Sequence, residues 1–459
     1  MKSKTGKMLA AVLMMSAIVL SSGCSGKSTP PPAAAGQTEA NTQETGAPAQ
    51  AEAANEEELK AEDGAVIKFA YWEGSPSDTA AWKAVLDRFR KDHPEIELVA
   101  EAYPSKTFRD QLDTMIAGNE WPDVMRYTYQ RLGKFKEADV MLDLTGKISQ
   151  ETLDDLIPAY KEALTYNGKL VGLPHHTDTI AIFYNKKMFE EAGIRIPKNT
   201  TDGWSLEELT EISRKLKAEY DLDTAFSGIW ENGNGYRFLP LLYMNGGKIL
   251  SDDGTEIAVN SPETLEVLTM LGDWTKEGLM PKASFLQDAQ TNMMFSAQKT
   301  AFVFAGSWHT TFMDENFKDG WAVTYMPQVN GKTTSDLGGN GLFAYKETKY
   351  PNACAIFIDY IARKDNMKLF CEEGNFIPVS QSLIAEGLEF KNFPEEMKVF
   401  LEIAATVDPK MAQDETSSRF QQLNVIWCEQ TEALIVNGSV SPEDTMKNLE
   451  EKMQEALDE

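Results

Sequence analysis

The sequence has few of the residues on which thiol, disulfide and metal chemistry depend. Its 459 residues include only 4 cysteines and 4 histidines. Three cysteines, Cys354, Cys371 and Cys428, lie far from the N-terminus, and their odd number and wide spacing do not fit a disulfide framework or a metal cluster. Cys354 and Cys371 fall on consecutive predicted helices and could pair, but three buried thiols are the preferred interpretation. We therefore expect no metal site.

The common motifs of hydrolases and nucleotide-binding enzymes are also missing. The chain has no Gly-x-Ser-x-Gly turn, no His-Glu-x-x-His pair and no phosphate-binding Walker loop. His309 stands beside Ser307, but residues so close in sequence cannot form a hydrogen-bonded catalytic relay. We expect no catalytic residues and no cofactor. A secreted glycoside-active enzyme stays open as an alternative, because it needs only two carboxylates about 5–9.5 Å apart.

Basic residues are in the minority. The chain has 44 lysines and arginines against 71 aspartates and glutamates, with a formal net charge of -27. Nucleic-acid phosphates require a basic surface, so this balance excludes nucleic acid as a partner. It also disfavours anionic ligands, although a local pocket can differ from the average.

A single short apolar run stands at the N-terminus. It spans Met8–Leu20, which is 13 residues, and follows three lysines. A helix that crosses a membrane needs roughly 20 apolar residues, so this run predicts a cleaved secretory signal. Small residues and then Cys24 follow, and this arrangement resembles the bacterial lipobox, with Ser21 at the position of the usual leucine. The resemblance implies a lipoprotein signal peptide over 1–23 and acylation of Cys24, which would anchor the protein to the membrane.

The region behind Cys24 differs in composition from the rest of the chain. Residues 24–64 are rich in proline, alanine, glutamine and glutamate and contain almost nothing that could form a core. Such a segment predicts a disordered tether. The remainder, 65–459, is too long for one core and predicts two domains.

The first part of this remainder alternates between strands and helices. Strands are predicted at 66–72, 96–102 and 124–127, and helices at 82–89 and 108–116. This alternation predicts an α/β fold with a mainly parallel sheet and helices on both faces. Ligands of such sheets bind beyond the carboxyl ends of the strands.

Several sequence blocks occur in the order found in one protein family. The blocks are Phe69–Trp72, Gly168–Pro174, Ile182–Phe189, Trp204–Leu209, Asn245–Gly247, Gly306–Trp308 and Gly338–Leu342. Over about residues 66–380 the chain resembles the family-1 extracellular solute-binding proteins, which include maltose-binding and multiple-sugar-binding proteins. The C-terminal residues match this family only loosely.

The resemblance implies a fold of the periplasmic-binding-protein-like type II. Two α/β lobes would be joined by a hinge that the chain crosses several times, with the ligand cleft between them. The N-lobe would comprise 65–176 and 328–375, and the C-lobe 177–327 and 376–459. The implied function is capture of a carbohydrate, an oligosaccharide, by hinge closure and its delivery to the transmembrane permease subunits of an ABC importer. The protein would act as a monomer at the extracellular face of the bacterial cell membrane. The alternative within this fold is a lipoprotein that senses a ligand for a membrane receptor.

A sugar needs aromatic rings against its C–H faces and hydrogen-bonding groups around its hydroxyls. The resemblance implies that Asp178 meets the ligand at the hinge and that Trp308 stacks on a sugar ring. The other expected ligand-binding residues lie at strand ends or in glycine-rich loops. They are Trp72, Glu73, Ser75, Tyr127, Gln130, Arg131, Trp230, Tyr236 and Asn340.

Some of these expectations carry alternatives. Either Tyr127 or Gln130 is expected in the site, and one of Trp230 and Tyr236. Trp72 could belong to the core, with Glu73 or Ser75 reaching the ligand instead.

The pair His175–His176 precedes Asp178. Neighbouring side chains on a strand point to opposite faces, so at most one histidine is expected to face the cleft. Trp427, near the C-terminus, is expected to be a packing residue.

Overall fold

The computed structural model describes residues 59–105, 107–228, 235–282, 288–438 and 440–458. The predicted signal peptide and Cys24 lie outside these residues. The end of the predicted tether, in contrast, belongs to the folded structure. The Glu62 carboxylate accepts hydrogen bonds from the backbone N–H groups of Asn352 (2.8 Å) and Ala353 (3.0 Å), and so satisfies the exposed start of a helix.

The first of two large sheets has five strands in the order β2-β1-β3-β11-β6. The strands are β1 (Val66–Glu73), β2 (Glu97–Pro104), β3 (Val124–Thr128), β6 (Leu173–His176) and β11 (Asn340–Ala344). The pairings of β1 with β2 and β3 are parallel, as predicted. Four of the five strands share one direction, so this sheet is mainly parallel, as predicted; the exception is β11, which is antiparallel to both of its neighbours. The reason is that β11 returns from the second sheet, and local strand–helix alternation contains no information about that return.

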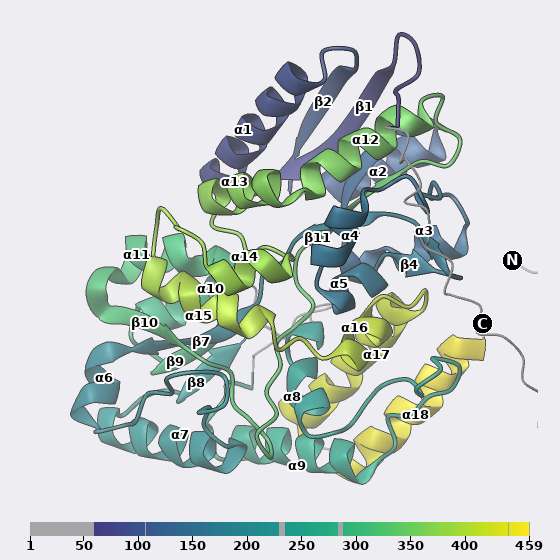
Figure 1. Ribbon diagram of the computed structural model, residues 1–459. Helices are drawn as coiled ribbons and strands as arrows, with labels where there is room; N and C mark the ends of the chain where they lie inside the picture. Colours follow the sequence, from purple (N-terminus) through teal and green to yellow (C-terminus); the bar gives the residue numbers. More distant parts are fainter. Residues whose placement is uncertain (1–58, 106, 229–234, 283–287, 439, 459) are drawn as a thin grey trace, which may run out of the picture. The chain divides into compact units, whose positions relative to one another are not determined.

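Helices cover both faces of this sheet (Figure 1). Associated helices and short strands are α1 (Pro76–Asp92), α2 (Phe108–Ala117), α3 (Gly133–Glu137), α4 (Gln150–Asp155), α5 (Pro158–Glu162), β4 (Thr165–Tyr166), β5 (Lys169–Leu170), α12 (Pro351–Ala362) and α13 (Lys364–Gly374). Phe69 and Tyr71 of β1 face α1, where Trp82 lies 5.1 Å and 4.9 Å from them between ring centroids. Trp72 points to the other face and contacts Phe108 of α2, 5.2 Å away. The period-2 alternation of a strand thus places Trp72 on the face opposite α1.

The second sheet has four strands in the order β10-β7-β9-β8. They are β7 (Ile180–Asn185), β8 (Phe226–Gly228), β9 (Phe302–Gly306) and β10 (Trp321–Thr324). Phe302 and Phe304 of β9 pack in one hydrophobic cluster, and Val303 and Ala305 in another on the opposite face. Both faces are therefore buried, which explains the continuous apolar sequence of β9.

The helices around this sheet are α6 (Lys186–Glu191), α7 (Leu206–Tyr220), α8 (Leu239–Met244), α9 (Pro262–Lys276), α10 (Asp288–Ser296), α11 (Thr310–Phe317), α14 (Gln381–Glu386) and α15 (Pro394–Ala404). Short 3-10 turns are η1 (Tyr129–Arg131), η2 (Gly235–Arg237), η3 (Ser307–His309) and η4 (Lys318–Gly320). Cys354, Cys371 and Cys428 are buried and form no disulfide, which confirms the preferred interpretation. Within the described residues, the helices are too short or too polar to span a bilayer.

The C-terminal segment forms helices that contact elements near both sheets. These are α16 (Pro409–Glu415), α17 (Phe420–Glu432), the π-helical turn η5 (Ala433–Asn437) and α18 (Pro442–Asp458). α16 packs against both α5 and α8, and α18 packs against α9 and α17. Trp427 is fully buried in this packing, as predicted. The lobe boundaries given above stay a prediction.

Three chain segments run between elements of one sheet's half and elements of the other: residues 177–179 between β6 and β7, 325–339 between β10 and β11, and 375–380 between α13 and α14. These first, second and third connections are hydrogen-bonded to one another at Thr177. Thr177 lies between β6 and β7, and exchanges backbone hydrogen bonds of 2.7 Å and 3.1 Å with Ile377. Its hydroxyl donates to the Gly338 carbonyl (3.0 Å), which lies between β10 and β11. The three connections are therefore hydrogen-bonded to one another where they pass between the sheets.

Candidate functional site

A cavity of about 580 Å³ lies at these connections. Its wall combines the loop after β1, the end of β3, the turn after β9 and Arg237 of η2 with all three connecting segments. The loop after β1 and the end of β3 are carboxyl ends of parallel strands, where the alternating pattern predicts ligands.

The loop after β1 is held by a buried ion pair. Arg126 of β3 donates to the Asp78 carboxylate (3.1 Å) and to the Trp72 carbonyl (2.7 Å). Its guanidinium also lies 4.3 Å from the centre of the Trp72 ring. Asp78 in turn accepts from the Gly74 N–H (2.9 Å), and Ser75 caps α1. This network orients Trp72 and Ser75, which both line the cavity.

Asp178 lies in the cavity wall on the first connection. Its side chain is surrounded by protein but keeps part of its surface open to the cavity. Burial raises the pKa of Asp178 to about 6, while Arg126 and the Gly339 N–H lower it. A Cβ atom on Gly338 would overlap the Asp178 carbonyl oxygen, so glycine is required for the two connections to come this close.

Asp336 lines the back of the same cavity and was not expected from the sequence. It is fully buried, and its Oδ1 atom accepts hydrogen bonds from the Ile180 N–H (3.0 Å) and the Ser335 hydroxyl (3.1 Å). Burial and the nearby Asp178 raise the pKa of Asp336 to about 7. Its only sequence signal is its position just before the glycines of a matched block.

Asn340 lines the cavity and contacts the histidine pair. Its Nδ2 lies 3.1 Å from Nε2 of His176, whose Nδ1 lies 3.2 Å from Nδ1 of His175. Both imidazoles contact Phe370, at 4.1 Å and 5.5 Å between ring centroids, so the expectation that they point to opposite faces is wrong. The register shifts at Asn340, which pairs with His176 while the next residue pairs with Pro174. This bulge at His175 interrupts the alternation and turns both rings to one side.

Two aromatic side chains line the cavity from other segments. Trp308 is 36% exposed and follows β9, and the Arg237 guanidinium lies 5.3 Å from the centre of its ring. A Cβ atom on Gly306 would overlap this ring, so Gly306 lets Trp308 fold back over the strand end. Phe376, which the sequence reasoning missed, lies on the third connection and stacks on Phe370 at 5.1 Å.

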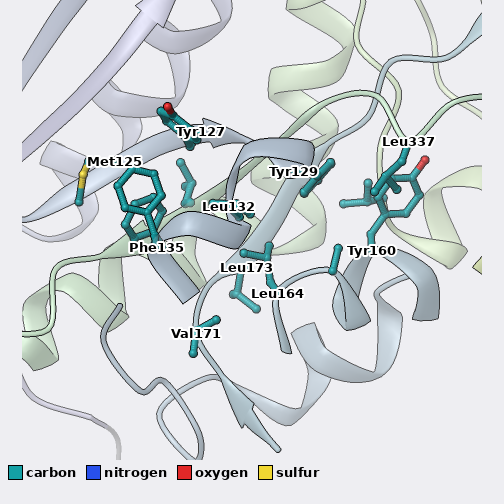
Figure 2. Close-up of a cluster of buried hydrophobic side chains, with 14 of the residues drawn as sticks. Met125, Tyr127, Tyr129, Leu132, Phe135, Tyr160, Leu164, Val171, Leu173 and Leu337 are labelled. Atoms are coloured by element: carbon teal, nitrogen blue, oxygen red, sulfur yellow. The ribbon is translucent and has the colours of Figure 1, made fainter. Parts of the chain in front are cut away.

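The structure separates the two candidates at the end of β3. Gln130 is buried in the cavity wall and donates to the Leu337 carbonyl. Tyr127 is 3% exposed and packs in the hydrophobic core, 5.1 Å from Phe135 between ring centroids (Figure 2). Since Arg126 and Thr128 line the cavity, strand alternation points Tyr127 away from it.

Glu73 and Arg131, two other expected residues, do not line the cavity. The Glu73 carboxylate accepts a hydrogen bond from the Thr79 hydroxyl (2.8 Å). Trp230 lies outside the described residues. The backbone of Tyr236 is part of η2, but its side chain is not described.

Comparison with known proteins identifies the family. Residues 84–398 match the family described as bacterial extracellular solute-binding protein. The chain belongs to this family. This confirms the resemblance inferred from the sequence blocks and places the protein among binding proteins that capture extracellular solutes.

Both curated relatives and solved structures are similar to this chain. The maltodextrin-binding protein MdxE of Bacillus subtilis is 26% identical over 323 residues, which are 68% of this chain and 73% of the relative. The galactooligosaccharide-binding protein of the same organism is 24% identical over 387 residues, 82% of this chain and 86% of the relative. The GacH receptor of Streptomyces glaucescens has a TM-score of 0.70 at 20% identity, with 86% of this chain and 99% of that one covered. These similarities confirm the two-lobed α/β fold.

The solute-binding protein has a second cavity, of about 660 Å³, between α1, α4, α13 and α14. Its polar side chains are largely paired with one another. Arg363 forms an ion pair with Asp359 (2.8 Å), and Tyr360 donates to Asp92 (2.6 Å). The cavity at the connections differs because three large aromatic side chains, Trp72, Trp308 and Phe376, line it together with Asp178, so it is the candidate ligand site.

Proposed function

We propose that this solute-binding protein captures a carbohydrate, an oligosaccharide, in the cavity at the connections. The observation that supports this is the combination of Trp72, Trp308 and Phe376 with Asp178 and Asn340 around one space. Flat rings pack on the C–H faces of a pyranose, and carboxylate and amide oxygens accept its hydroxyl hydrogens. We propose these five residues, with Ser75 and Gln130, as the ligand-binding set.

The names of the relatives support the same class of ligand. One curated relative binds maltodextrin and another binds galactooligosaccharide, as their names state. The GacH structures include a complex with acarbose. We propose delivery of the sugar to the transmembrane permease subunits of an ABC importer, with the two sheets closing on it by rotation about the connecting segments. The proposal includes no chemical change of the sugar.

A thermal-shift screen tests the ligand class. A sugar present at 100 times its dissociation constant is expected to stabilise the folded protein by about 2.7 kcal/mol, because it binds only the folded state. The panel should contain maltotriose, a galactotriose and a xylotriose, with sorbitol at equal concentration as the control for osmolyte effects. Chromatography of the same samples should recover the sugars intact. Cleavage products would contradict the binding function, and a panel without any shift would contradict the carbohydrate assignment.

We also propose that residues 1–23 are removed and that acylated Cys24 holds the protein at the cell surface. The support is the lipobox-like sequence before Cys24 and the long segment between it and the folded part. The variant Cys24→Ser is expected to appear in the culture medium, because it lacks the thiol that carries the lipid. Wild-type protein should stay in the membrane fraction. Retention of Cys24→Ser in that fraction would contradict the anchor.

A further inference from the structure

The inner wall of the ligand cavity presents hydrogen-bond acceptors without partners. Oδ2 of Asp336, Oδ1 of Asn340 and Oδ1 of Asn375 are buried, and none has a hydrogen-bond partner among the described residues. These oxygens come from two of the three connections and line the same cavity. A buried acceptor without a partner costs free energy, so this side of the cavity favours a ligand that brings hydrogen-bond donors and disfavours one that brings further acceptors or negative charge.

The orientation of Asn340 follows from the histidine pair behind it. Burial lowers the pKa of both His175 and His176 well below its usual value, so both rings are neutral. A neutral His176 has one acceptor nitrogen, and Nε2 takes that role toward Nδ2 of Asn340 at 3.1 Å. Its other nitrogen, Nδ1, then donates to Nδ1 of His175 at 3.2 Å. This arrangement turns the amide oxygen of Asn340 away from the histidines.

The charged groups of the wall carry a net negative charge. Among the described residues, the charged side chains that line the cavity are Asp78, Arg126, Asp178, Arg237 and Asp336. Arg126 forms a fully buried ion pair with Asp78, at 3.1 Å. Arg237 acts electrostatically on both Asp178 and Asp336. When all five groups are ionised, three carboxylates therefore face two guanidinium groups.

We propose that Asp336, together with Asp178, determines which sugars the site accepts. The two carboxylates make this part of the cavity wall favourable for hydroxyl or ammonium donors of the sugar. They exclude sugars that carry a carboxylate on the ring that lies against this wall. This inference rests on the proposed carbohydrate function and narrows it to neutral or aminated sugars. Asp178 contacts the ligand, and the fully buried Asp336 acts through the charge that it adds behind Asp178.

Three trisaccharides that differ in one group test this selectivity. The probes are maltotriose, its analogue with glucuronic acid at the non-reducing end, and its analogue with a 6-amino group on the same ring. Calorimetry at pH 8 is expected to show the uronic acid analogue binding at least about tenfold more weakly than maltotriose, because two like charges about 5 Å apart repel strongly at a protein surface, where the effective dielectric constant is about 20. The amino analogue is expected to bind at least as well as maltotriose.

The variant Asp336→Asn keeps the size of the side chain and removes its charge. The selectivity is the association constant of maltotriose divided by that of the uronic acid analogue. Asp336→Asn is expected to lower this ratio about tenfold. Asp414→Asn is the matched control, since Asp414 is also a buried aspartate with a raised pKa but lies outside the cavity, bound to Tyr243 (2.5 Å) and Lys410 (2.6 Å). This control should retain the wild-type ratio. A purely structural role of Asp336 would change both affinities equally.

The outcomes distinguish a failure of the charge selectivity from a failure of the proposed carbohydrate binding. Equal or tighter binding of the uronic acid analogue by wild-type protein would overturn the selectivity, whether or not Asp336→Asn folds. An unchanged ratio in folded Asp336→Asn would remove Asp336 from the explanation. Failure of all three probes to bind would contradict the proposed function for maltose-type sugars, and the inference with it.

Discussion

Trp308→Ala is expected to weaken carbohydrate binding about 100-fold, which corresponds to about 2.7 kcal/mol. Trp308 is among the few large hydrophobic side chains that the described structure leaves exposed, at 36%, and it lines the cavity. A bound sugar would cover this ring and remove its apolar surface from water. The alanine variant loses that contact, while the free protein loses little because the ring is already solvated. Isothermal calorimetry with the sugar identified by the thermal screen measures the change.

Trp121→Ala is the matched control for this substitution. Trp121 is half-buried and stacks on Tyr345 at 4.4 Å between ring centroids, and it is not among the residues that line the cavity. Its loss should leave the affinity for the sugar unchanged while lowering the melting temperature. Equal affinities of wild-type protein and Trp308→Ala would show that the sugar binds elsewhere.

Gly338→Ala is expected to lower the free energy of unfolding by roughly 3 kcal/mol and to abolish sugar binding. The added Cβ atom would overlap the Asp178 carbonyl oxygen and approach its carboxylate. Both neighbours are held by the connecting segments, where the Gly338 carbonyl accepts from Thr177. The methyl group can fit only if the first and second connections separate. Urea denaturation measures the stability, and calorimetry the binding.

A glycine in a helix provides the opposite result as a control. Gly272 lies within α9, and the atom nearest to an added Cβ would be in Leu434 at 3.5 Å, an ordinary contact. Gly272→Ala is expected to stabilise the protein by about 0.5–1 kcal/mol, because alanine favours the helix. Equal stability of Gly338→Ala and wild-type protein would mean that the connections can move apart at little cost.

Local sequence patterns predict the elements of this fold well and their pairing less well. The strand at Val66–Glu73 and the helix that carries Trp82 follow directly from apolar periodicity. The antiparallel direction of β11 does not, because it depends on where the chain re-enters the sheet more than 160 residues after β6 began. Short-range patterns contain no such information.

In the candidate site, too, some residues could be predicted from the sequence and others could not. Asp178, Trp308 and Asn340 follow recognisable blocks, and all three line the cavity. Asp336 and Phe376 lie in irregular connections where no periodicity says which way a side chain points. Tyr127 illustrates the opposite error: it stands at the right strand end, but the pleat turns it into the core.

The hydrogen bonds at Thr177 determine which relative movements of the two sheets cost little free energy. We expect a rotation about an axis along the three connections to preserve the hydrogen bonds from Thr177 to Ile377 and Gly338, because the bonded groups then turn together. Sliding one connection past another would break them, at about 1 kcal/mol each. The two sheets should therefore rotate relative to each other about a single axis and not about several. A single distance between probes on the two sheets would then suffice to follow this rotation.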